Sequence, residues 1–156
     1  MKKLLLLFVI AVITGISFTG CNKSSKNNSA QKQQEIYKQA IQKVLDCDAM
    51  TGKVDNSDLD AYYRSTENKV QNMQKIDLSQ CPPEFQTAFI DHISAWQQKL
   101  RVTRESFIFC IPGLIVDPIP GALEYAVNEA FNNIITTWNK VLQIAIKYGV
   151  NVSKYK

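Results

Sequence analysis

Apolar residues recur along this chain at the three- and four-residue steps of amphipathic α-helices. The first such segment covers residues 35–46, and Gln and Lys side chains fill its opposite face. A second segment covers residues 58–76 with a thinner apolar row, so we expect this helix to be half exposed. Ser57 is a suitable N-cap for the second helix, with Asp60 three residues later.

The third and fourth segments carry clear start and stop signals. Pro82 and Pro83 can open the third helix, because the first turn does not need their N–H groups, and its apolar row continues to Phe107. The fourth segment runs from about residue 119 to residue 148, and Gly149 is suited to end it in a left-handed conformation. No window alternates with period two. The pattern therefore predicts an all-α fold, an antiparallel bundle of about four helices.

The first residues follow a different pattern. Two lysines precede an almost unbroken apolar run over residues 4–18, which Thr19, Gly20 and Cys21 follow. A basic start, an apolar middle and small residues before a cut are the parts of a secretory signal. The apolar run is about 15 residues long, short of the ~20 that a membrane-spanning helix needs, so a retained membrane helix is disfavoured.

The stretch Phe18-Thr19-Gly20-Cys21 resembles the lipobox of bacterial lipoproteins, although Phe18 stands where that family usually has leucine. The resemblance implies that residues 1–20 are a lipoprotein signal peptide and that Cys21 carries fatty acyl chains such as palmitate. These chains would anchor the protein in a bacterial membrane. In Gram-negative members of that family an Asp after the cysteine retains the protein in the inner membrane, so Asn22 favours the outer membrane, facing the periplasm. The alternative is an ordinary secretory signal that is cut elsewhere.

The predicted mature chain has two parts. Residues 21–34 are the lipidated cysteine and a polar stretch without aromatic or acidic residues, which we expect to be a disordered tether. Residues 35–156 form the helical bundle domain. Removal of residues 1–20 leaves 16 basic and 14 acidic residues, a formal charge of +2. A chain so close to neutral, without a concentrated basic face, indicates no nucleic-acid partner.

Three cysteines follow Cys21 in the sequence, namely Cys47, Cys81 and Cys110. None of them has the C-x-x-C spacing of zinc or redox sites. An oxidising envelope compartment favours one disulfide and one free thiol. In an up-and-down bundle Cys47 and Cys110 lie at the same end, so we expect these two to pair. The alternative is three unpaired thiols packed as small apolar residues.

His92 is the only histidine, and it lies on the apolar row of the third helix. A single histidine without a spaced partner makes a poor metal site, so we expect a buried imidazole with hydrogen-bond partners inside the bundle, such as a tyrosine of the second helix. The alternative is a pocket for a small apolar ligand formed by His92, Trp96 and Trp138. The acidic residues between 46 and 60 lack the order of a calcium loop, so we predict no metal and no cofactor.

Residues 107–119 are apolar, yet their prolines and glycine prevent a continuous helix. Loops are normally polar, so this stretch forms either a lid over one end of the bundle or a contact surface. In the second case Phe109, Leu114, Ile115 and Val116 are the candidate contact residues. The choice between lid and contact surface stays open from the sequence alone.

No catalytic triad, phosphate-binding loop, dinucleotide fingerprint or metalloprotease motif is present, so we do not expect an enzyme. Residues 81–85, 92–96, 137–138 and 145–150 look similar to small uncharacterised bacterial lipoproteins, which implies a shared helical fold without an activity. We therefore expect a lipid-anchored cell-envelope protein that acts by contact with another envelope protein, as an adaptor, inhibitor or immunity-type protein. The alternative is a periplasmic carrier of a small apolar ligand.

Overall fold

The computed structural model describes residues 23–109 and 122–155, and within these ranges all regular structure is helical. In chain order the helices are α1 (Lys23–Ala49), α2 (Leu59–Gln74), α3 (Pro83–Phe109), α4 (Ala122–Lys147) and the short 3-10 helix η1 (Ser153–Tyr155). The helices pack against one another, so the prediction of an all-α helical bundle is confirmed.

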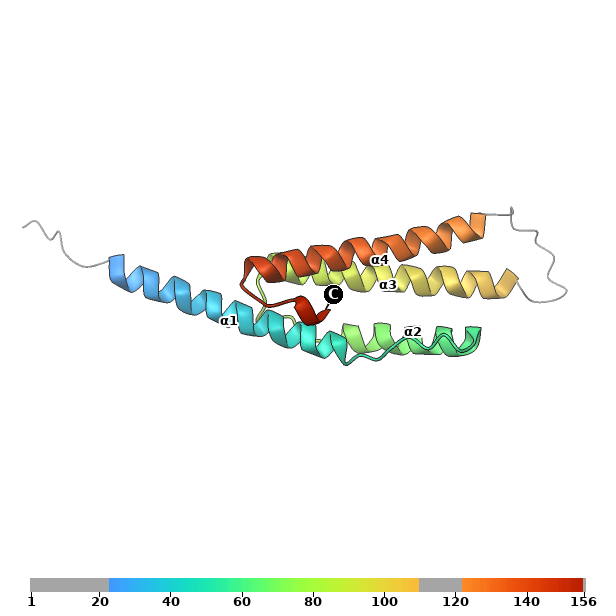
Figure 1. The fold of residues 1–156 in the computed structure, drawn as a ribbon, viewed down its shortest axis with the longest axis horizontal. Coiled ribbons are helices and arrows are strands. Elements are labelled where there is room, and N and C mark those ends of the chain that lie inside the picture. The colour runs from blue at the N-terminus through green and yellow to red at the C-terminus, as the bar shows by residue number, and fades with distance from the viewer. Residues whose placement is uncertain (1–22, 110–121, 156) are drawn as a thin grey trace, which may run out of the picture.

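The helices α2, α3 and α4 lie side by side and alternate in direction, and the most extensive packing joins α3 to α4 (Figure 1). In contrast, α1 is displaced along the bundle. Its N-terminal half projects beyond the other helices, and only its C-terminal half packs against them (Figure 1). Along the long axis, α1 lies beside α3 and α4 at one end of the bundle, and α2 lies beside them along the other part (Figure 1).

The start of α1 corrects the predicted tether. Residues 23–34, which the sequence indicated as disordered, form the first turns of α1. This stretch lacks proline and glycine and contains Ala30 with several Gln and Lys residues, all of which propagate a helix readily. Packing of the C-terminal half of α1 provides the nucleus from which the helix extends outward. Residues 28–35 are exposed, so their helical form depends on propagation and not on burial.

The N-cap of α2 is one residue later than expected. Asp58 is the cap, and its Oδ1 accepts the backbone N–H of Ala61 at 2.8 Å. The backbone N–H of Ser57 is bound instead by the carboxylate of Asp55 at 2.9 Å, which places Ser57 in the preceding turn. A carboxylate at this position also interacts favourably with the positive end of the helix dipole.

Gly149 ends α4 as predicted. Its φ is +80°, a left-handed value that glycine adopts without the strain that a Cβ would cause. The N–H of Val150 then reaches back to the carbonyl of Ala145 at 3.0 Å, which closes a Schellman motif. The chain turns away from α4 here, and this turn brings the last residues back toward α1 (Figure 1).

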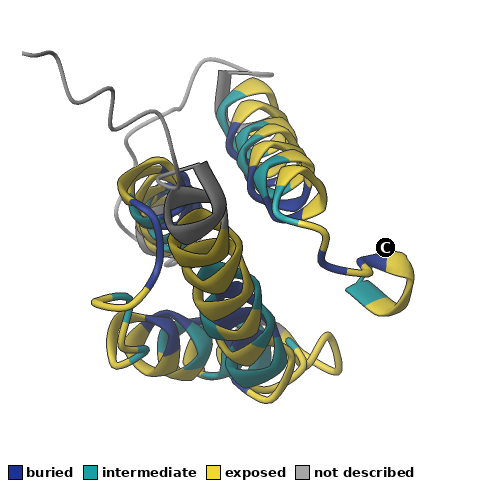
Figure 2. Cartoon of the chain, turned by 90° about the vertical axis from the view of Figure 1, so that its left-hand side faces the viewer, coloured by how far each residue is buried: buried dark blue, intermediate teal, exposed yellow. Residues whose placement is uncertain are grey.

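The hydrophobic core lies at the end of the bundle where the C-terminal half of α1 packs against the other helices. Figure 2 shows buried and exposed positions alternating around the helices, as the sequence pattern requires. The cluster of buried residues draws on α1 to α4 and on the chain after α4: Ile41, Val44, Leu45, Met73, Cys81, Phe85, Ala88, Phe89, Val141, Leu142, Ala145, Val150 and Val152. Within the described ranges, no helix has an apolar stretch long enough to cross a bilayer.

Candidate functional site

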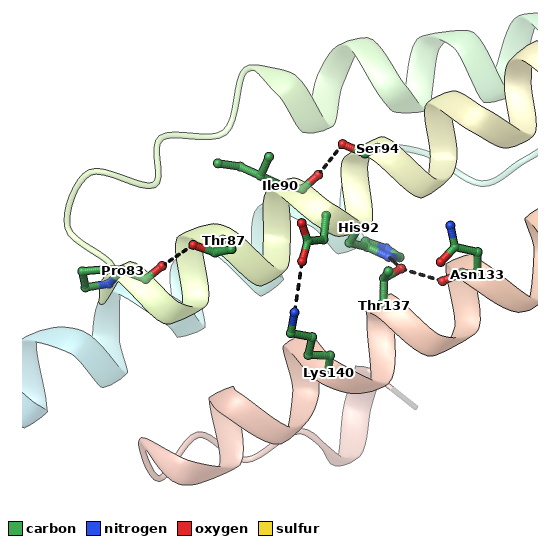
Figure 3. Close-up of polar contacts among 9 residues, drawn as sticks. Pro83, Thr87, Ile90, His92, Ser94, Asn133, Thr137 and Lys140 are labelled. Carbon is green, nitrogen blue, oxygen red and sulfur yellow. Dashed lines mark hydrogen bonds and ion pairs between the residues drawn. The ribbon is translucent and has the colours of Figure 1, made fainter.

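His92 lies between α3 and α4, and its side chain is 3 % exposed. Its Nδ1 is 3.0 Å from the hydroxyl of Thr137 (Figure 3). The indole N–H of Trp96 donates to its Nε2 at 3.1 Å. The hydroxyl of Thr137 in turn donates to the carbonyl of Asn133 at 2.8 Å. The partners of His92 therefore come from α3 and α4, and the predicted tyrosine of α2 is not among them.

This chain of hydrogen bonds fixes the tautomer of His92. Because Nε2 accepts from Trp96, the proton of the neutral ring must be on Nδ1, where it is donated to Thr137. Burial, aided by the positive charge of Lys69, lowers the pKa of His92 to about 4. A neutral imidazole that donates on one side and accepts on the other has no free nitrogen for a metal or a substrate proton.

The three residues of the predicted ligand pocket do meet, but they contact one another. The ring centroids of His92 and Trp138 are 4.9 Å apart, and those of His92 and Trp96 are 6.4 Å apart. The indole N–H of Trp138 donates to the backbone carbonyl of Tyr155 at 3.1 Å. A surface hollow is present elsewhere, along α1, where Lys38, Gln42 and Asp46 are among its lining residues. The three predicted pocket residues act as a packed polar layer in the bundle.

Asp91 precedes His92 but takes no part in this layer. Its carboxylate binds the ammonium of Lys140 at 3.0 Å on the outer side of α3 and α4 (Figure 3). In the first turn of α3, the carboxylate of Glu84 binds the ammonium of Lys147 at 2.8 Å. Both pairs are about half exposed, so each contributes little to stability. Both pairs join α3 to α4 along the surface.

We call the end of the bundle that holds Ile41, Leu45, Phe85, Phe89 and Val141 the closed end. Here the last residues of the chain tie α1 to α4. The Asp46 carboxylate accepts from Lys154 Nζ at 2.6 Å and from the Tyr155 hydroxyl, and these two hydrogen bonds are the main causes that lower the pKa of Asp46. We call residues 150–155 the C-terminal strap, and within it the side chains of Val150 and Val152 are buried.

We call the opposite part of the bundle, which holds Lys99, Thr103, Phe131 and Ile135, the open end. There α1 is absent, because it stops well short of the end of α3 (Figure 1). On α4, the side chain of Phe131 is 53 % exposed and that of Ile135 is 45 % exposed. These apolar residues border the position that α1 occupies at the closed end.

Lys99 is an unusual residue to find on the inner row of α3. It is 7 % exposed overall, and its Nζ lies 5.7 Å from the centroid of the Phe131 ring. Burial lowers the pKa of this ammonium. Among the described residues, no carboxylate lies within ion-pair distance of Lys99. At the open end, Lys99 therefore contacts an aromatic ring but has no anionic partner among the described residues.

A second lysine stands between the two ends. The ammonium of Lys69 donates to the hydroxyl of Thr51 at 2.9 Å and lies 5.3 Å from the Trp96 ring centroid. The nearby Asp48 carboxyl is buried, and one of its oxygens has no hydrogen-bond partner in the described part of the chain. Burial raises the pKa of Asp48, and the charge of Lys69 partly opposes that rise.

Cys47 and Cys81 are the two described cysteines, and they are not bonded to each other. Burial raises the pKa of Cys81 to about 11, so its thiol is inert at neutral pH. Cys110 lies outside the described residues, and a bond between Cys47 and Cys110 stays a prediction. Its rationale was that α1 and α3 end at the same level, whereas α1 ends near the middle of α3 (Figure 1).

Several predicted residues fall outside what the structure describes. These are the lipidation residue Cys21 and the candidate contact residues Leu114, Ile115 and Val116; Phe109 is the last residue of α3, and its side chain is not described. Within the described ranges, no group of three or more His, Cys, Asp or Glu side chains is placed to hold a metal ion. Comparison with protein-family models, curated proteins and solved structures gave no match.

Sequence reasoning missed Lys99 and the strap. Lys99 stands three residues after Trp96 and four before Thr103, so its position on the apolar row of α3 was a usable signal. The strap gave no such signal. Lys154 and Asp46 are far apart in the sequence, and only the turn at Gly149 brings them together.

Proposed function

We propose that this chain is a lipid-anchored protein of the bacterial cell envelope that acts by contact with another protein and has no catalytic role. The observation that carries this proposal is the open end of the bundle. Phe131 and Ile135 are large apolar side chains that remain about half exposed on a helix whose neighbouring bundle position is unfilled in the described residues. Neighbouring exposed apolar residues on one face are typical of interaction sites.

Further support comes from the packing of the alternative site. His92, Trp96 and Trp138 contact one another between α3 and α4. The indole N–H of Trp138 also donates to the backbone carbonyl of Tyr155. A carrier of a small apolar ligand needs an apolar hollow with few polar groups. We therefore favour contact with a protein over carriage of a ligand.

The anchor follows from the resemblance of residues 18–21 to a lipobox, with Cys21 as the acylated residue and the outer membrane, facing the periplasm, as the location. Two or more acyl chains would hold the protein at the membrane for its lifetime. Intact-mass analysis of the mature protein tests this part of the proposal. We expect a chain that begins at Cys21 and carries the added mass of acyl groups; an unmodified first residue would contradict it.

Site-specific photo-crosslinking in intact cells tests the contact role. A benzophenone side chain at Ile135 should yield an adduct with another polypeptide. The same group at Ile90 is the matched control, because Ile90 is 53 % exposed on the outer side of α3. Adducts at Ile135 and none at Ile90 would support the proposal. Equal adducts at both positions, or none at either, would contradict it.

A further inference from the structure

The N-terminal part of α1 differs in charge from the rest of the chain. Residues 22–34 contain three lysines, Lys23, Lys26 and Lys32, and no acidic residue. Residues 35–156 contain the other 13 basic residues of the predicted mature chain and all 14 of its acidic residues, a formal charge of −1. The whole positive excess therefore lies in residues 22–34, which we call the basic arm.

The fold keeps most of the basic arm away from the bundle. The helix begins at Lys23, and the N-terminal half of α1 projects beyond the other helices (Figure 1). At the usual rise of a helix, residues 23–34 extend over about 18 Å. Charges in water act over only ~8 Å at physiological salt. The weakly acidic body of the protein is therefore too far from the start of α1 to cancel the positive charge there.

The nearest carboxylate in the sequence does not neutralise the basic arm either. Lys32 is exposed, and among the described residues no carboxylate lies within ion-pair distance of its ammonium. Glu35 is the first acidic residue of the chain, and its carboxylate lies 3.8 Å from the ammonium of Lys38, on the bundle side. The positive charge of the arm is thus available to anions outside the protein.

The place of the basic arm in the chain indicates which anions it meets. The arm follows directly after Cys21, the residue that carries the lipid anchor in the proposed function. An anchored Cys21 would bring the first turn of α1 to the level of the lipid headgroups. Lysines at that level gain about 1 kcal/mol each from anionic lipids. The chemistry that best fits the arm is therefore that of a phospholipid surface with negative headgroups.

We propose that the basic arm binds anionic phospholipid headgroups of the membrane that holds Cys21. This inference rests on the proposed function and adds a second membrane contact to the acyl chains. The open end lies at the opposite end of the molecule from the arm (Figure 1). An arm held at the headgroups therefore leaves Phe131 and Ile135 on the part of the bundle that is distant from the membrane attachment, accessible to a partner protein.

Co-sedimentation with lipid vesicles tests the proposal without the acyl chains. The full mature chain with Cys21→Ser cannot be acylated, so its binding reports the polypeptide alone. At low ionic strength we expect it to bind vesicles of equal parts phosphatidylglycerol and phosphatidylcholine, and not vesicles of phosphatidylcholine alone. Binding should disappear at about 0.5 M salt, where screening is nearly complete.

Removal of the three charges of the arm should weaken this binding. In the same Cys21→Ser background, the triple variant Lys23→Gln, Lys26→Gln and Lys32→Gln should lower the partition coefficient for the phosphatidylglycerol vesicles at least about tenfold. Glutamine keeps a side chain of similar length and a good helix propensity, so α1 should form as before. Circular dichroism checks the helix content of the variant.

A second triple variant is the matched control. Lys53→Gln, Lys75→Gln and Arg104→Gln remove the same number of positive charges from exposed side chains of the body. The two triple variants therefore have the same net charge and differ only in where the charge was lost. The control should bind the phosphatidylglycerol vesicles within about threefold of the Cys21→Ser chain, because its lost charges lie away from the arm.

Absence of binding to the phosphatidylglycerol vesicles, equal binding to both lipid compositions, or equal losses in the two triple variants would overturn the inference. The anchor is tested separately by the intact mass of the wild-type protein. An acylated Cys21 with equal losses in the two triple variants would overturn this inference and leave the proposed function intact. An unmodified Cys21 with a loss confined to the arm variant would contradict the anchor and support lipid binding by the arm.

Discussion

The two ends of this bundle are built from the same helices, yet they differ in how their inner rows are filled. At the closed end, Phe85 and Phe89 are completely buried beneath α1 and the C-terminal strap. At the open end, Phe131 of the neighbouring helix is about half exposed, and a lysine occupies an inner position. We therefore expect the closed end to contribute most of the stability of the fold, whereas Phe131 and Ile135 remain accessible at the open end.

The difference between the two ends follows from how far α1 covers the other helices. A three-helix arrangement of α2, α3 and α4 leaves one side of the inner rows uncovered, and α1 covers only part of it. The sequence matches this division, since α3 has Phe85, Ala88 and Phe89 where α1 packs and Lys99 and Thr103 where it does not. Lys99 and Thr103 are themselves buried, so the exposed apolar side chains of the open end are those of α4, Phe131 and Ile135.

The largest expected effect separates the two ends directly. Phe89→Ala should lower the free energy of unfolding by about 3–5 kcal/mol, because it leaves a cavity in the packed core. Phe131→Ala should cost less than about 1 kcal/mol, because its ring already contacts solvent in the single chain. Urea unfolding of both variants, followed by circular dichroism, measures the two values. Similar costs would mean that the ends are equally packed.

Acid should unfold the protein partly through His92. Burial lowers its folded-state pKa from an ordinary value of 6.5 to about 4, so folding disfavours the protonated ring. Its stabilising contribution is complete above pH ~6.5 and is lost as the pH falls toward about 4, a loss of about 3 kcal/mol. The measurement is the free energy of unfolding at several pH values for the wild type and His92→Gln. Parallel pH curves for the two proteins would contradict this assignment.

The substitution Asp48→Asn should stabilise the protein by about 1 kcal/mol at neutral pH, since the buried carboxylate has an oxygen without a hydrogen-bond partner. Burial raises the folded-state pKa of Asp48 above the ordinary value of 3.8, so its contribution to stability is present in acid and is lost as the pH rises through that folded pKa. The advantage of asparagine should therefore vanish in acid. Thermal melts at neutral and acidic pH measure it, and a destabilised variant at neutral pH would refute this view of Asp48.

The smallest effect concerns the strap. Tyr155→Phe removes the hydroxyl that binds Asp46 but keeps the ring, so the free energy of unfolding should fall by only about 0.5–1 kcal/mol. The local consequence is more specific: amide exchange in the C-terminal half of α1 should accelerate, while exchange in the middle of α3 stays unchanged. Uniform acceleration in both helices would show that the strap does not hold α1 in particular.

The fold was largely predictable, and the departures have physical causes. Helical spacing and the terminating Gly149 identified the helices, because amphipathic rows and left-handed glycine are local properties of the sequence. The extension of α1 back to Lys23 was missed, since composition alone does not show that an exposed polar stretch will continue a helix that is anchored further along. The staggered position of α1 depends on tertiary packing, which the pattern does not encode.

The site was predictable only in part. The spacing of His92 and Trp96 on one helix face anticipated that they would meet, and Trp138 joins them from α4. That these rings satisfy one another, with Thr137 as the second partner of His92, required the relative register of α3 and α4. Lys99 was overlooked because a charged residue is usually assigned to the solvent side of a helix.

Hydroxyl-radical footprinting of the protein in native membranes and after purification as a dilute monomer tests the central claim most directly. If the open end is the contact surface, Phe131 and Ile135 should be strongly protected in membranes, while the exposed residues Met50 and Ile90 react equally in both samples. If all four side chains react equally in the two samples, the open end is not covered by another protein and the account is contradicted.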